Sequence, residues 1–333
     1  NLGYASIQLE ARGRLSGNGY HSFQIQEFRR PEYEVSAQAD SELHVIGGGA
    51  DVTVKASYFA GGGLAGADVN WYLTASETSF TPPNRDDFTF GRWVPWWGWG
   101  RRWWDDGGGY TPPPSWQHQG KTDATGAHVL HLDFLGVNPP TPMSVSANAA
   151  VTDVNRQAWN ANATLLVHPS LAYVGLRTPR PYVDKGQAID VEAIMVDLDG
   201  KALVGQPIAL QAARLDYQYE KGKYVETEED VQTCALTSAA DAGKCSFATP
   251  EGGQYKIVAV VADARGRKNR TELTVWVSGG KTPPAREVEE EQVTLIPDAK
   301  AYKPGDTAEL LVQAPFYPAE GVLSVRRSGI VTS

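Results

Sequence analysis

Two cysteines are the residues best placed for covalent chemistry in this chain. Cys234 and Cys245 are separated by a turn-like stretch of Ser, Ala, Asp and Gly. If that stretch closes a hairpin, the two thiols face each other across its strands, close enough for a disulfide. The alternative is two unpaired thiols that pack as small hydrophobic groups. We expect the disulfide, which indicates an oxidising compartment such as the periplasm or the cell exterior.

Other reactive side chains do not combine into a catalytic or metal-binding pattern. His128 and His131 would point to opposite faces of a strand, which is poor geometry for a shared metal. Two cysteines without a nearby histidine make a poor zinc site. The sequence has no G-x-S-x-G elbow, no H-E-x-x-H motif and no carboxylate pair typical of a glycosidase. We therefore expect no catalytic residue, no cofactor and no metal, and a protein that is not an enzyme.

A cluster of aromatic residues is the sharpest local feature. Seven of the ten tryptophans fall between Trp93 and Trp116. Exposed aromatic surface usually binds a partner, a glycan or a membrane interface. Our first interpretation is that this loop covers its own domain as a private core, and the alternatives are contact with a neighbouring domain or a membrane. The candidate contact residues are Trp93, Trp96, Trp97, Trp99, Trp103, Trp104, Tyr110 and Trp116.

Composition narrows the class of protein. Apolar residues make up 41% of the 333 positions and charged residues 21%, which is enough for packed domains. The 34 glycines and 21 prolines suit many short strands better than long helices. The net charge of −9 argues against a nucleic-acid partner, because phosphate binding needs basic patches. No stretch approaches the roughly 20 apolar residues of a membrane helix.

Three strand phrases recur along the chain. In the first phrase, a turn with Gly leads into a strand of alternating apolar residues, and alternation of this kind marks strands with one buried face. Repetition of the phrases at this spacing predicts an array of similar domains, and the length of each repeat is that of an antiparallel β-sandwich. The first phrase occupies residues 43–63, 182–203 and 302–317, the second 122–134 and 238–250, and the third 151–167 and 261–277.

The repeats predict an all-β chain of tandem antiparallel β-sandwiches. Residues 1–30 would be the last strands of a preceding domain, and 31–169 a sandwich with a Trp-, Pro- and Gly-rich insertion at 76–119. Residues 170–278 would form a second sandwich, in which we expect the acidic run 226–230 to be a solvated loop. Residues 279–333 would hold a linker and the start of a further domain.

Several of these phrases resemble the α2-macroglobulin family. Residues 23–35, FQIQEFRRPEYEV, resemble the junction between its macroglobulin-like domains, and residues 58–69, YFAGGGLAGADV, resemble one of its hairpins. Residues 302–316, YKPGDTAELLVQAPF, followed by 321–330, GVLSVRRSGI, resemble the opening of the domain that carries the bait region. The order of these matches agrees with the family, and the pattern looks most like its bacterial branch.

The resemblance implies a large trap for endopeptidases. In that family a protease cuts an exposed bait segment, the ring of macroglobulin-like domains rearranges, and many members capture the protease through a Cys–Gln thioester. Neither Cys234 nor Cys245 continues into a thioester motif, so this chain would be scaffold. Expected partners are target endopeptidases and neighbouring macroglobulin-like domains, in the periplasm or outside the cell, with a membrane anchor at a missing N-terminus. The alternative is a cell-surface adhesion or carbohydrate-binding array that uses the Trp-rich loop.

Overall fold

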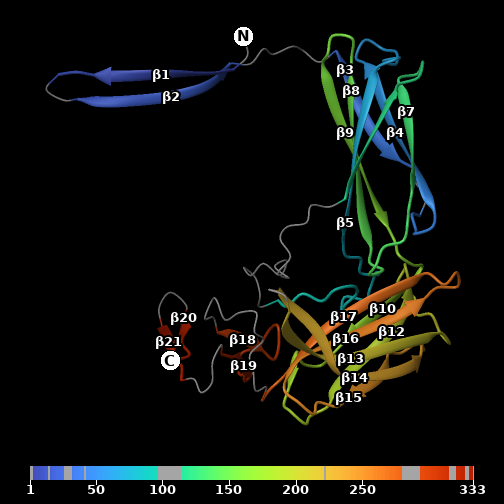
Figure 1. The fold of residues 1–333 in the computed structure, drawn as a ribbon, viewed down its shortest axis with the longest axis vertical. Helices are drawn as coiled ribbons and strands as arrows, with labels where there is room; N and C mark the ends of the chain where they lie inside the picture. Colours follow the sequence, from blue (N-terminus) through green and yellow to red (C-terminus); the bar gives the residue numbers. More distant parts are fainter. Residues whose placement is uncertain are drawn as a thin grey trace.

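The computed structural model of the chain consists of β-strands joined by turns and loops (Figure 1). It describes residues 3–13, 16–25, 32–40, 43–96, 114–220, 223–279, 293–314, 320–326 and 330–332. Within these ranges, no helix has the length and apolar character needed to cross a bilayer. The predicted all-β class, with tandem antiparallel sandwiches, is confirmed.

The first sandwich packs a three-stranded sheet against a four-stranded one. Alternating apolar residues of β4, among them Val52 and Val54, enter the core between the sheets. Trp71 of β5 is buried there, and its indole Nε1 donates to Nδ1 of His128 over 3.1 Å, so its polar atom keeps a partner. In spatial order the sheets are β3 (Tyr33–Ala39), β4 (Gly49–Tyr58) and β7 (Ala127–Asp133), and β6 (Ser115–Lys121), β5 (Asp68–Glu77), β8 (Met143–Thr152) and β9 (Ala158–Val167).

The second sandwich repeats this plan with a five-stranded second sheet. Its core joins alternate residues of both sheets, such as Val191, Leu210 and Ile257. The short strand β11 runs parallel to β17 and covers the end of the outer edge of β17. In spatial order the sheets are β10 (Ala172–Arg177), β12 (Ile189–Asp197) and β15 (Gly243–Phe247), and β11 (Tyr182–Val183), β17 (Lys268–Val277), β16 (Gly253–Ala262), β13 (Pro207–Glu220) and β14 (Lys223–Thr237).

Among the described residues, three further strand pairs lie outside the two sandwiches. Each pairs two antiparallel strands. They are β1 (Gly3–Ala11) with β2 (Gly17–Ile25), β18 (Thr294–Pro297) with β19 (Leu310–Gln313), and β20 (Val325–Arg326) with β21 (Ile330–Thr332).

The insertion in the first sandwich is shorter than the expected span 76–119. Ser76 and Glu77 still pair with β8, and the residues from Ser115 onward pair with β5. The connection is therefore residues 78–114. The mostly polar ends of the span, residues 76–77 and 115–119, looked like loop, but they continue the sheet because their neighbours satisfy their backbone groups.

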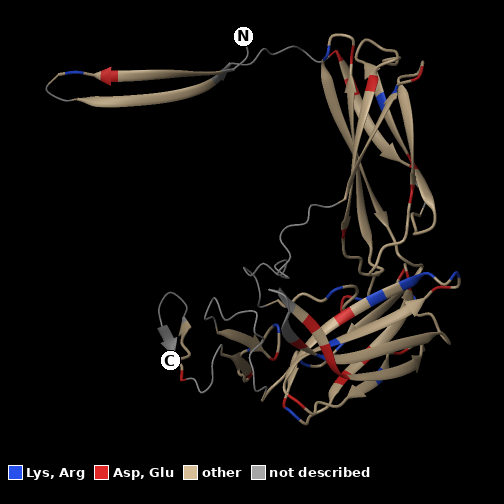
Figure 2. Ribbon diagram, in the orientation of Figure 1, with Lys and Arg blue, Asp and Glu red and all other residues tan. Residues whose placement is uncertain are grey.

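The acidic run 226–230 is not a loop; it lies within β14. Lys256 of β16 pairs with Glu226 and Glu228 at 2.8 and 2.7 Å, and Arg214 of β13 pairs with Asp230 at 2.8 Å. Figure 2 shows basic and acidic positions interspersed over this sandwich. Opposite charges on β13, the neighbouring strand, and on β16, the strand beyond it, therefore offset the repulsion that would favour a solvated loop.

Cys234 and Cys245 form the expected disulfide, but it does not cross a hairpin. Cys234 lies in β14 of the five-stranded sheet and Cys245 in β15 of the three-stranded sheet. Their Cα atoms are 6.3 Å apart. The turn between them carries the chain from one sheet to the other, so the bond links the two layers of the sandwich.

Replacing both cysteines by alanine should lower the free energy of unfolding by about 3 kcal/mol, the loop-entropy value for a closed loop of about this length. Urea denaturation followed by tryptophan fluorescence measures the change. The single variant Cys234→Ala is the control and should lose about as much, since it also opens the loop. Two titratable thiols in the unfolded, unreduced protein, or an unchanged unfolding midpoint in the double variant, would contradict the bond.

Candidate functional site

The described half of the Trp-rich insertion packs on the second sandwich, not on the one from which it emerges. We call residues 78–96 the strap. Figure 1 shows it leaving the end of β5 and running along strands of the second sandwich. Its side chains Phe88 and Phe90 are buried, and Phe80 packs beside them. The partners that they bury on the second sandwich are Tyr173, Ile194 and Val196.

The strap also pairs through its backbone with two strand edges. Thr89 and Leu176 of β10 exchange reciprocal N–H···O bonds of 2.8 and 2.9 Å. Glu272 of β17 donates to Gly91 over 2.9 Å and accepts from Trp93 over 3.1 Å. The strap therefore occupies the gap between the free edges of the two sheets, in the way that an added strand docks on an exposed sheet edge.

Strand β10 is apolar on both faces because the strap covers its outer side. Val174 and Leu176 enter the sandwich core, whereas Tyr173 faces the strap. Gly175 lies where the strap comes closest, and a Cβ atom added there would lie 2.7 Å from Cζ of Phe90. A strand that is buried on both faces reads as a continuous apolar run, which is what residues 172–176 show.

Charged groups hold the rim of this contact. The Arg177 guanidinium lies 4.5 Å from the centre of the Phe88 ring and pairs with Asp87 of the strap at 2.5 Å. Arg177 also pairs with Glu192, and hydrogen bonds from Arg177 and then Lys244 hold the pKa of that carboxyl below its usual value. Because one guanidinium serves both an aromatic ring and two carboxylates, it orients the strap on the sandwich.

A buried histidine lies at the junction between the two sandwiches. His168 is only 5% exposed, and its Nδ1 lies 2.8 Å from the Tyr173 hydroxyl. The Phe80 ring of the strap is 4.7 Å from the His168 ring. Burial, and then the nearby His44, lower the pKa of His168, while burial raises the pKa of the Tyr173 hydroxyl. The neutral imidazole is therefore the form that fits the junction.

The candidate tryptophans do not form one site in the described ranges. The Trp93 and Trp96 rings pack 6.0 Å apart, and Trp93 lies 5.9 Å from Trp276 of the second sandwich. Trp116 lies apart from them on β6 and is 53% exposed. The other candidates, Trp97, Trp99, Trp103, Trp104 and Tyr110, lie outside the described residues. The first interpretation, a private core on the parent sandwich, does not hold for the described strap.

Sequence reasoning missed the residues that build this contact: Phe80, Phe88, Phe90, His168 and Tyr173. The one available signal was the unbroken apolar run 172–176, which departs from the alternation found in most other strands. No group of three or more His, Cys, Asp and Glu side chains in the described ranges is arranged to hold a metal ion.

Comparisons with known proteins agree with this architecture. No model of a known protein family matches the chain. An α2-macroglobulin homolog of Nostoc sp. is 26% identical over 327 residues, which cover 96% of this chain and 16% of that protein. An α2-macroglobulin homolog of Deinococcus radiodurans is 29% identical over 193 residues, or 56% of this chain and 18% of its own. The matched segment therefore spans less than a fifth of the length of either relative.

Solved structures give the same result. Trypsin-activated α2-macroglobulin from Escherichia coli aligns with 94% of this chain and 21% of its own length, at a TM-score of 0.50 and 16% identity. The chain is similar to bacterial α2-macroglobulins in sequence and in fold. The resemblance of its strand phrases to that family is confirmed, and the two sandwiches correspond to macroglobulin-like domains.

Gly175→Val should weaken the contact of the strap with the second sandwich, because the added side chain overlaps Phe90 in a close-packed layer. Overpacking of this kind costs roughly 1–3 kcal/mol. Limited proteolysis should cut residues 78–96 faster in this variant. The matched control is Gly136→Val, at a glycine with no atom within 4 Å of the added Cβ. Equal rates of cleavage in the two variants would contradict the role of Gly175.

Acidification should destabilise the junction through His168. The pKa of His168 is lowered in the folded protein, so its contribution to stability is complete above the ordinary histidine pKa of about 6.5 and is lost as the pH falls below it. His168→Gln should therefore flatten the pH dependence of the free energy of unfolding on the acid side.

His131→Gln provides a control of opposite sign. A hydrogen bond to Asp51 raises the pKa of His131, so this residue contributes stability below its ordinary pKa. Removing it should steepen the loss of stability on acidification, by a small amount because His131 is exposed. Urea melts at several pH values measure both slopes, and parallel curves for the two variants would refute the assignment.

Proposed function

We propose that this chain is part of the scaffold of an α2-macroglobulin-type endopeptidase trap. The observation that carries the proposal is sequence similarity to an α2-macroglobulin homolog along 96% of the chain. Two solved neighbours from Escherichia coli are described as activated by trypsin and by porcine elastase. By analogy, the targets of this protein would be endopeptidases that cleave a bait segment.

In this proposal the chain works mechanically and not as an enzyme. The strap, the His168 junction and the buried phenylalanines join two consecutive sandwiches through backbone and side-chain contacts. A scaffold of this kind transmits a movement at one end of the array to the other without bending between the two units. The disulfide between Cys234 and Cys245 suits an oxidising compartment, which supports a periplasmic or extracellular location.

The rival function, adhesion or carbohydrate binding through the Trp-rich loop, has less support. Trp93 and Trp96 pack against each other, and Trp93 also packs against the second sandwich. Trp116 is exposed, but it is one ring on strand β6. Glycan and membrane sites usually present several aromatic rings on one surface.

The function can be tested with one large and one small protease substrate. The protein as its native cell makes it, mixed with a general endopeptidase, should suppress cleavage of the large substrate and spare the small one, because a trapped protease stays active behind a steric barrier. The 333-residue chain by itself should suppress neither. Equal suppression of both substrates by the native protein would indicate an active-site inhibitor, and no suppression would refute the trap.

A further inference from the structure

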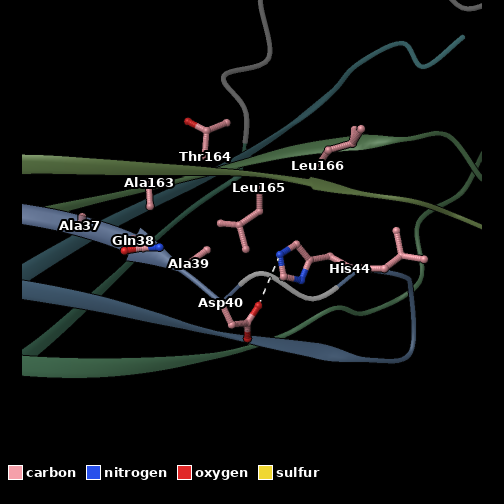
Figure 3. A pocket seen from close by; sticks show the side chains of 10 residues that line it. Ala37, Gln38, Ala39, Asp40, His44, Ala163, Thr164, Leu165 and Leu166 are labelled. Carbon is pink, nitrogen blue, oxygen red and sulfur yellow. Dashed lines mark ion pairs between the residues drawn. The ribbon is translucent and has the colours of Figure 1, made fainter. Parts of the chain in front are cut away.

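An open groove lies between the free edges of β3 and β9 of the first sandwich (Figure 3). Its volume is about 460 Å³. Residues 37–40 and 43–44 form one wall and residues 163–166 the other. In the part of the chain that the structure describes, no segment pairs with these two edges along the groove.

The strand phrases fix which positions of the two sandwiches correspond. Val52 and Val191 occupy the same place in the first phrase, so Val54 corresponds to Ala193. Val54 pairs with Ala37, and Ala193 pairs with Leu176. Ala37 in the open groove therefore corresponds to Leu176, which holds the strap in the second sandwich.

The opposite wall of the groove, formed by β9, corresponds to β17 of the second sandwich. His168 donates to the carbonyl of His44 over 2.9 Å, and Ser278 donates to the carbonyl of Val183 over 3.0 Å. Counting back from this shared bond, Asn162 of β9 corresponds to Glu272 of β17. Glu272 is the second residue that pairs with the strap. The open groove of the first sandwich thus lies beside the positions that pair with the strap in the second, because Ala37 lines it and Asn162 directly precedes its wall residues 163–166.

Both walls of the open groove present backbone groups that point outward. His168 directs its N–H and C=O away from the sheet, and alternation along an antiparallel ladder gives Thr164 and Leu166 the same direction. Asp40 donates its N–H inward to Asp51, so Ala37 and Ala39 direct theirs outward. Two free strand edges therefore face this groove, which is the surface that β-augmentation uses.

Two buried polar atoms in the wall also lack a hydrogen-bond partner among the described residues. They are Oδ1 of Asp40 and Nδ1 of His44, and His44 is 8% exposed. Figure 3 shows the two side chains facing each other, with Nε2 of His44 3.6 Å from Oδ1 of Asp40, which is too long for a hydrogen bond. Oδ1 of Asp40 therefore has an ion-pair neighbour but no hydrogen bond, and a cationic donor would supply one.

The outer face beside the groove differs from its counterpart. Where the second sandwich has Tyr173 and Ile194 under the strap, the first has Glu34 and Lys55, both exposed. Aromatic anchors like those of the strap would have nothing apolar to bury here. The occupant that fits is therefore polar on that side and joined mainly through its backbone.

We propose that this groove binds an extended strand of a partner protein that carries one basic side chain. The strand pairs with the edges at Ala37 and Thr164, and its basic side chain reaches Asp40. The strap on the second sandwich also carries a basic side chain to a strand edge, with Nε of Arg92 3.5 Å from Glu272 of β17, on the wall that corresponds to β9 and not to β3.

The probe is a fluorescent peptide with the strap sequence 87–94 in which both phenylalanines are replaced by threonine, DTTTGRWV. Titrated against the full chain, it should bind saturably with one site per chain. Asp40→Asn and Thr164→Pro should each weaken binding at least tenfold, because the first removes the carboxylate and the second an edge N–H. The matched control, Asp68→Asn, changes a carboxylate elsewhere on the same sandwich and should leave binding unchanged.

Variants of the peptide separate the contribution of its arginine from that of its backbone pairing. Replacing the peptide arginine by glutamate should abolish binding to the unaltered chain, while Asp40→Asn should make the chain indifferent to that replacement. A photoreactive group on the peptide should cross-link to residues 37–44 or 162–166. Cross-links to the second sandwich, affinity unchanged by Asp40→Asn, or no binding at millimolar peptide would each overturn the proposal. Dimerisation of the chain that Asp40→Asn abolishes would also overturn it, by making a second copy the occupant.

Discussion

The described architecture depends on the burial of the outer face of β10 and β12 beneath the strap. A two-layer sandwich needs only one apolar face on each sheet, and the opposite face normally meets water. Here Tyr173, Ile194 and Val196 face outward and are buried all the same, because Phe88 and Phe90 from the preceding sandwich lie over them. The second sandwich therefore depends on a segment of the first for part of its apolar burial. The two sandwiches therefore share a packed apolar contact, whereas flexibly linked domains share few contacts.

Backbone pairing gives this contact its register. Apolar burial is not directional, and a run of phenylalanines could settle on an apolar face in several ways. The reciprocal bonds between Thr89 and Leu176, and the pair that Glu272 makes with the strap, select one of these. Gly175 allows the close approach that the bonds require, since a side chain there would meet the Phe90 ring. Register, side-chain packing and the Arg177 contacts thus agree on a single arrangement.

The sequence predicted where the strands lie along the chain better than it predicted which segments contact one another. Alternation along residues 50–56 identifies β4, and the repeated phrases place the two sandwiches in order, because period-two burial is a local property of a strand. The cysteine spacing predicted the bond between Cys234 and Cys245, but not that it joins two sheets. A short polar turn can close a hairpin or cross between layers, and its composition is the same in both cases. The strap was not predictable, since its partners lie from about 90 to about 180 residues further along the chain and no periodicity encodes that pairing.

The two sandwiches also differ in how their open sides are closed. In the second, the strap and β11 cover the side where β10 meets β17. On the other side the disulfide joins β14 to β15, and the Gln232 side chain exchanges two 2.8 Å bonds with the backbone of Ala248. Both open sides of the second sandwich are therefore closed, one by the strap and β11 and the other by bonds between β14 and the end of β15. The first sandwich has no described counterpart on its β3–β9 side, where the edges remain unpaired along the groove.

Exposed edges persist in natural sheets when they are short, charged or reserved for a partner strand. The alanines at 37, 39 and 163 leave this edge neither bulky nor charged, with Asp40 at its end. This edge therefore has the composition of one that accepts a strand rather than of one protected against it.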